Sequence, residues 1–136
     1  MSQCDDESQE DDAVPKQFDE NVLNQLATTE EIEIETRSAT GRTHRTIIWV
    51  VVVDHQVYVR SVRGSRGRWY QEIVANPDAA IHVDGQRLAV QAVPVTDEAI
   101  ISRASGEILR KYRGDSSANS MVRPETLPTT LRLEPA

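Results

Sequence analysis

The chain has 136 residues, a length that suits one domain with a hydrophobic core of its own. Its formal net charge is −7, but residues 1–20 hold eight acidic side chains against one basic, so the remainder is neutral overall. A single cysteine excludes an internal disulfide, no apolar run approaches membrane-spanning length, and the acidic N-terminus is unlike a signal peptide. We therefore expect a cytoplasmic protein without a membrane segment.

The N-terminal part of the chain predicts a tail, a helix and a strand. Residues 2–12 are acidic with almost no apolar content, which predicts a disordered tail over residues 1–16, and residues 17–136 would form the domain. Apolar side chains at helical spacing predict an amphipathic helix over residues 17–28. Isoleucines alternate with glutamates over residues 31–36, as in a strand with one wet face.

A long strand is expected next, over residues 42–53. Ile47 to Val53 is apolar on both faces, so both faces should be buried. In a small antiparallel protein, one face would fill a barrel interior and the other would pack under a helix or against a second subunit. A turn at residues 54–56 would lead into another strand over residues 57–62.

The remaining elements complete a mainly β protein with helices. The pattern predicts a helix over 68–75 ended by Asn76-Pro77, a hairpin of strands 80–84 and 87–95, a helix from 96 to 112, and a closing strand over 129–133. Six antiparallel strands, one of them doubly buried, favour a small β-barrel.

The segment between the strand 57–62 and the helix 68–75 is the first candidate site. Gly64 and Gly67 permit a tight turn, and Arg63, Arg66 and Arg68 surround the start of the helix. The free N–H groups of a helix start, together with arginine side chains, suit a phosphate or a carboxylate. A solvated basic loop is the alternative interpretation.

Residues 41–85 resemble the pyridoxamine phosphate oxidase-like split barrels, near the deazaflavin-dependent nitroreductases. Three segments carry the resemblance: Gly41–Trp49, Val57–Ser61, and Arg66–Tyr70 running on to Ala75-Asn76-Pro77. The resemblance implies a six-stranded antiparallel split β-barrel that binds FMN or a deazaflavin coenzyme. Two departures, Val50 in place of a lysine and the Arg63-Gly64-Ser65 loop, leave the choice of cofactor open and also permit a barrel that has lost its cofactor.

The resemblance also assigns roles to individual residues. Arg45 and its strand neighbours would face the cofactor, Ser61 would close over it, and the arginine turn would hold its phosphate. The predicted cofactor-binding set is therefore Arg45, Thr46, Ile47, Ser61, Arg63, Gly64, Arg66, Gly67, Arg68 and Trp69.

The predicted function is a flavin- or deazaflavin-dependent oxidoreductase that transfers a hydride to a small organic acceptor. The cofactor ring would carry the chemistry, so no catalytic side chain is assigned. The three histidines lack metal-ligand spacing, and no metal site is expected. We expect a homodimer with a small-molecule substrate. The alternatives are a non-catalytic dimeric barrel that binds a phosphorylated ligand and, less favoured because aromatic residues are few and the tail is acidic, a nucleic-acid-binding barrel.

Overall fold

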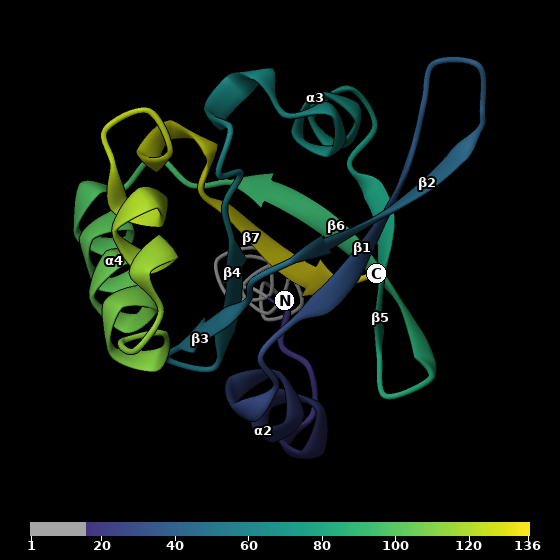
Figure 1. Cartoon of the computed structure of the whole chain (residues 1–136). Helices are drawn as coiled ribbons and strands as arrows, with labels where there is room; N and C mark the ends of the chain where they lie inside the picture. Colours follow the sequence, from purple (N-terminus) through teal and green to yellow (C-terminus); the bar gives the residue numbers. More distant parts are fainter. Residues whose placement is uncertain (1–15) are drawn as a thin grey trace, which may run out of the picture.

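A computed structural model of the chain describes residues 16–136. All seven strands of this part belong to one antiparallel sheet, with the order β2-β1-β5-β6-β7-β4-β3. The strands are β1 (Ile32–Arg37), β2 (Thr43–Ile48), β3 (Val51–Val53), β4 (Gln56–Val59), β5 (Asp78–Val83), β6 (Gln86–Pro94) and β7 (Leu131–Pro135). The sheet curls into an open barrel (Figure 1). The predicted acidic tail lies, except for Lys16, outside the described residues.

The strand count differs from the expected six because the long strand predicted over residues 42–53 is broken. Its first half, β2, pairs with β1 at one edge of the sheet, and its second half, β3, pairs with β4 at the other edge. Trp49 and Val50 carry the chain from one edge to the other. The two edges are therefore joined covalently, but β2 has no hydrogen-bonded neighbour on its outer side within residues 16–136.

Two side chains at the end of helix α4 (Glu98–Lys111), Lys111 and the C-cap residue Tyr112, hold this crossing in place. The Tyr112 hydroxyl accepts a hydrogen bond from the Val50 N–H and lies within hydrogen-bond distance of the carbonyls of Val50 and Glu30. Lys111 Nζ donates to the carbonyls of Val50 and Leu26, at 2.6 and 3.0 Å. The crossing is thus fixed by residues about 60 positions away in the sequence.

The core has two parts, one on each face of the curled sheet. The inner face packs Ile34, Ile81 and Leu133 against helices α2 (Glu20–Thr28) and α3 (Arg68–Ala75), which cover opposite ends of the barrel (Figure 1). The outer face of β3 and β4 packs Val51 and Tyr58 under α4. Burial on both faces was expected for residues 47–53. It is found for Ile48, Val50 and Val51, and the helix covers the outer face at β3. The expectation is wrong for Ile47, which is 61% exposed because no element of residues 16–136 covers the outer face of β2 there.

The other boundaries follow local capping. Helix α2 begins at Glu20 rather than residue 17 because the Asp19 side chain accepts a hydrogen bond from the Val22 N–H. The polar stretch after α4 contains two 3₁₀ helices, η2 (Ser116–Val122) and η3 (Leu127–Thr129), and another, η1 (Gly64–Arg66), precedes α3. Both predicted hairpin turns are present, with positive φ at Asp54 and Asp84. No helix among residues 16–136 is long and apolar enough to cross a membrane.

Candidate functional site

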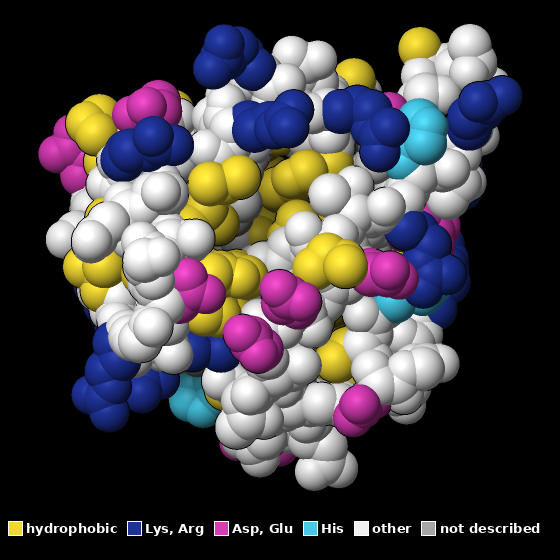
Figure 2. Space-filling model, viewed as in Figure 1, with side chains coloured by type: hydrophobic (Ala, Val, Ile, Leu, Met, Phe, Trp, Pro, Cys, Tyr) yellow, Lys and Arg dark blue, Asp and Glu magenta, His cyan; other side chains and the backbone are white. Residues whose placement is uncertain are grey.

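A cavity of about 690 Å³ opens between the free edge of β2 and the end of β4, where the barrel is split. Its walls come from β2, from residues 60–63, from the start of α3 and from η2. Figure 2 shows the hollow with hydrophobic side chains inside it, basic side chains above and acidic side chains below. A cavity of this size is within the usual range for a cofactor or drug-sized ligand.

One end of the cavity is formed by the start of α3. Gly67 is the N-cap residue, so no side chain caps the helix, and the first turn holds no acidic residue. The first N–H groups of any α-helix lack intrahelical acceptors, and the helix dipole places partial positive charge there. Arg68 and Trp69, the first two residues of α3, both line the cavity. This end of the cavity therefore has the features of an anion site.

Ser61 supplies an unpaired hydroxyl at the same end. The residue is 1% exposed, and its Oγ has no hydrogen-bond partner in the described part of the chain. It lies so close to Gly67 that a Cβ atom added there would be 2.4 Å from the oxygen. A larger residue at this position would therefore clash with the Ser61 side chain. The backbone of Gly67 itself, with φ −63°, suits any residue. Thr46 Oγ1 is a second buried hydroxyl without a partner on the cavity wall.

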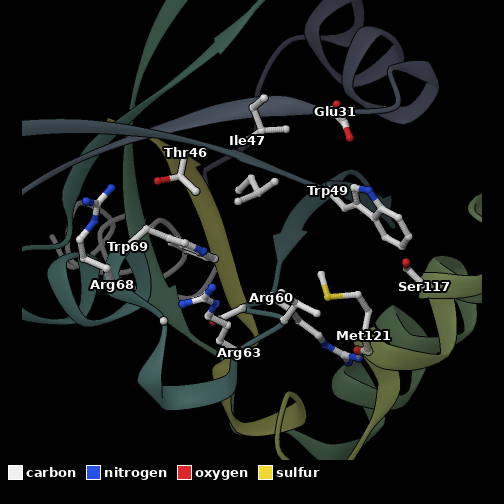
Figure 3. A pocket seen from close by; sticks show the side chains of 14 residues that line it. Glu31, Thr46, Ile47, Trp49, Arg60, Arg63, Arg68, Trp69, Ser117 and Met121 are labelled. Atoms are coloured by element: carbon white, nitrogen blue, oxygen red, sulfur yellow. Dashed lines mark hydrogen bonds between the residues drawn. The ribbon is translucent and has the colours of Figure 1, made fainter.

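Exposed arginines flank this end. Arg63 and Arg68 line the cavity, whereas Arg66 lies outside its wall. None of the three forms an ion pair within residues 16–136. Figure 3 shows Arg68, Thr46 and Trp69 together at one end of the cavity. Two full positive charges thus add to the partial charge of the helix start.

The opposite end of the cavity is aromatic and apolar. Trp49, Ser117 and Met121 gather there in Figure 3. The Trp49 indole stacks on the Tyr112 ring, with 3.9 Å between centroids and 4° between planes. Because the Tyr112 hydroxyl is tied to the strand crossing, the stack holds the indole in one orientation. The exposed Glu31 lies at this end of the rim.

Arg60 lies between the two ends, at the base of the cavity, and is 2% exposed. Its side chain runs away from β4 toward α4, η2 and β7, where it is hydrogen-bonded. Burial lowers its pKa to about 10, so the guanidinium is still charged at neutral pH. The strand pattern gave no reason to single this residue out, because an arginine in an alternating strand is usually exposed.

Two histidines pair with glutamates instead of gathering as metal ligands. His44 Nδ1 lies 2.9 Å from Glu72 Oε2, which ties β2 to α3, and His82 Nε2 lies 2.7 Å from Glu35 Oε1 on the outer face of the sheet. Glu35 also accepts two hydrogen bonds from Arg87. These hydrogen bonds lower the pKa of Glu35 to about 2, Arg87 contributing more than His82.

The structure brings together most of the predicted cofactor-binding set. Seven of the ten residues line the cavity: Thr46, Ile47, Ser61, Arg63, Gly67, Arg68 and Trp69. Arg45 does not, because strand alternation turns it to the outer face, where it pairs with Glu33. Gly64 lies behind the wall, packed against the Glu125 backbone with φ +66°. Arg66 extends from the turn into solvent. The cavity also includes Arg60, Trp49 and Met121, which the prediction did not assign.

Solved structures share this fold at low sequence identity. An F420-H2-dependent reductase has a TM-score of 0.58 at 14% identity, over 76% of this chain and 93% of that one. A Listeria innocua protein assigned provisionally as a pyridoxamine 5′-phosphate oxidase has 0.58 at 14%, over 83% and 87%. The Vibrio cholerae heme storage protein HutZ has 0.60 at 12%, over 88% and 91%. The predicted split-barrel fold is therefore confirmed, and the chain shares it with these solved structures.

Comparison of the sequence with curated proteins finds no significant match. A family model does match, over residues 22–133, which is nearly the whole described domain. Its description is "Uncharacterized protein conserved in bacteria", and the matched span includes β1 to β6 and the first three residues of β7. The chain is a split-barrel protein that belongs to this bacterial family, DUF2255.

Proposed function

We propose that the cavity binds a flavin-type cofactor, FMN or a deazaflavin coenzyme, and that the protein is an oxidoreductase acting on a small organic acceptor. The F420-H2-dependent reductase and the oxidase-like protein that share the fold support this class of chemistry. The fold likeness alone does not specify the ligand, so the argument depends on the residues of the cavity.

The proposal is carried by the groups that gather at the α3 end of the cavity. An uncapped helix start, a Ser61 hydroxyl and the arginines 63 and 68 meet at one point, and neither the hydroxyl nor the two arginines pair with any side chain of residues 16–136. Buried hydroxyls are normally hydrogen-bonded, so we take the Ser61 hydroxyl on the cavity wall as part of the phosphate site. We propose that a terminal phosphate accepts hydrogen bonds from the N–H groups of Arg68 and Trp69, from Ser61 Oγ and from the Arg63 and Arg68 side chains.

The rest of the cavity suits a flat ring system. Ile48 and Trp49 give it apolar and aromatic walls, and the Trp69 indole borders it from the α3 end. A bound flavin or deazaflavin would supply hydride transfer. The chain would orient the ring against the Trp49 indole, which is stacked on Tyr112, and would keep water away from one side of it. No acid, base or nucleophile of the chain is needed for that chemistry.

Heme fits the described cavity less well, although a heme storage protein shares the fold. Heme iron is held in proteins by histidine, cysteine, methionine or tyrosine. The residues of the described chain that line the cavity include only Met121 from this set. We therefore favour a flavin-type cofactor.

A homodimer is proposed together with the cofactor. Ile47 and Val62, at the mouth of the cavity, are 61% and 46% exposed, which is high for large apolar side chains. A second subunit that covered them would also narrow the opening.

We also propose a cytoplasmic location, because the single cysteine allows no internal disulfide.

Native mass spectrometry of the full chain, purified from a host that makes both FMN and a deazaflavin coenzyme, tests the proposal. We expect one cofactor per subunit and a mass that identifies which one. The purified complex should then reduce a small organic acceptor with a chemical or enzymatic reductant. A chain that binds a phosphorylated compound but never transfers a hydride would establish the non-catalytic alternative. A chain that takes up neither FMN nor a deazaflavin, even when it is supplied in excess, would contradict the proposal.

A further inference from the structure

Arg60 is a charged side chain enclosed by neutral groups. Its Nε donates to Thr130 Oγ1, its Nη1 to Ser105 Oγ and to the Met121 carbonyl, and its Nη2 to the Ile101 carbonyl, over distances of 2.7 to 3.1 Å. The acceptors belong to α4, to η2 and to the residue before β7. The guanidinium therefore joins three elements that come from different parts of the chain.

The hydrogen bonds leave its charge without a counter-ion. No carboxylate of residues 16–136 forms an ion pair with Arg60. A guanidinium has five N–H groups, and the four bonds above use four of them, which leaves one N–H of Nη2 free. Buried charges in proteins are normally paired, because removing an ion from water is unfavourable. An unpaired buried cation therefore favours a negative group nearby.

A purely architectural role would explain the four hydrogen bonds but not the choice of a charged residue. Neutral acceptors satisfy donors without neutralising the charge, so the positive potential extends into the surrounding low-dielectric space. The cavity is the open space next to Arg60, and both Arg60 and its acceptor residue Met121 line it. The exposed Glu31 carries the opposite charge at the rim, but water and salt screen an exposed charge far more than a buried one.

We propose that Arg60 makes the Met121 end of the cavity a subsite for an anion, so that the small molecule bound there carries a carboxylate or a similar oxyanion. This subsite is distinct from the phosphate site at α3, where Arg63 and Arg68 supply the charge. The inference deepens the proposed function, on which it rests for the view that this molecule is the substrate. It gives the charge of the acceptor, which neither the family nor the fold specifies.

Two probes with the same ring separate charge from shape: nicotinate, which is an anion at neutral pH, and nicotinamide, which is neutral. Both tryptophans of the chain line the cavity, so quenching of their fluorescence reports binding. A charge-assisted hydrogen bond is about twice as strong as a neutral one, so we expect nicotinate to bind roughly tenfold more tightly. Equal affinities of the two probes would overturn the proposal.

Three variants show which residue causes the preference for nicotinate over nicotinamide. Arg60→Met should reduce this preference to less than about twofold. Arg60→Lys should retain about threefold, because an ammonium keeps the charge and loses the planar fork. Arg68→Ala should retain the full preference, since it alters only the α3 end. If Arg60→Met does not fold, as judged by its circular dichroism, the other two variants still decide. A preference that is intact in Arg60→Lys and lost in Arg68→Ala would place the anion at α3 and refute the subsite.

A separate titration with FMN keeps this test independent of the proposed function. FMN binding together with equal affinities for nicotinate and nicotinamide would leave the oxidoreductase proposal standing and remove the Arg60 subsite. An Arg60-dependent preference for nicotinate in a chain that binds neither FMN nor a deazaflavin would leave the Arg60 subsite standing and remove the oxidoreductase proposal.

Discussion

Replacing Gly67 with alanine tests the contact on which the phosphate site depends. The new Cβ atom would lie 2.4 Å from Ser61 Oγ, so one of the two groups would have to move. The backbone itself accepts alanine, because Gly67 has φ −63° and ψ 135°. The next nearest atoms, the Gly64 carbonyl oxygen and Ser61 Cβ, are both 3.6 Å away, which is an ordinary contact distance. The clash is thus with one oxygen atom.

The size of the effect follows from that geometry. Inserting a methyl group into a filled space costs about 1 to 3 kcal/mol of folding stability. Alanine is a poorer N-cap than glycine, but it also reduces the entropy of the unfolded chain, and these two effects of up to about 1 kcal/mol oppose each other. In a Ser61→Ala background the clashing oxygen is gone. Gly67→Ala should therefore cost about 1 to 3 kcal/mol in the parent and nearly nothing in that background.

Urea denaturation of the parent, both single variants and the double variant measures this coupling, provided that the m-values agree. Ser61→Ala alone should be close to neutral, because the hydroxyl it removes has no partner. The reasoning is refuted if Gly67→Ala destabilises both backgrounds equally, since the loss would then not arise from the Ser61 hydroxyl.

Three further predictions concern the frame around the site. Tyr112→Phe removes the hydroxyl that is bonded to the backbone of Val50, so we expect a loss of about 1 to 3 kcal/mol in urea denaturation, and no loss would contradict the role given to it. Because Arg87 is the main cause of the low pKa of Glu35, about 2 against an ordinary 4.5, the stability from this carboxylate is complete above pH 4.5 and is lost as the pH falls toward 2. Melting curves of Glu35→Gln should show a shallower acid loss than the parent, and parallel curves would argue against it. Light scattering at micromolar concentration should give twice the chain mass, and Ile47→Asp should shift it toward the monomer; a parent that is already monomeric would contradict the dimer.

The pattern of the sequence predicts the elements better than their connections. The run from Ile47 to Val53 is continuously apolar, and nothing in it marks a break at Trp49 and Val50. The break exists because the chain must pass from one edge of the sheet to the other, and Tyr112, more than 60 residues later, holds it there. Interactions of that range leave no local signal in the strand.

In the candidate site, too, the residues that are close in the sequence could be predicted, and those placed by distant contacts could not. Glycines, arginines and a helix start lie close together in the sequence, so residues 61–69 could be predicted as one end of the cavity. Strand alternation puts Arg45 and Thr46 on opposite faces, so the two side chains cannot both face a cofactor. The following run is apolar on both faces, so the pattern does not show which of the two faces is the inner one. Arg60 could not be singled out, because its burial depends on α4 and η2 closing over the strand, and this packing arises only in the folded chain.

The affinity difference between FMN and riboflavin tests the central claim most directly, since riboflavin has the same ring system and lacks the phosphate. The account predicts that FMN binds about ten- to a hundredfold more tightly to the parent, the effect of a charge-assisted hydrogen bond of roughly 1.5 to 3 kcal/mol. Arg68→Ala should lose about tenfold of that difference. Arg113→Ala, which removes an exposed arginine outside the cavity wall, should keep all of it. Equal affinities of FMN and riboflavin for the parent would contradict a phosphate site at the start of α3.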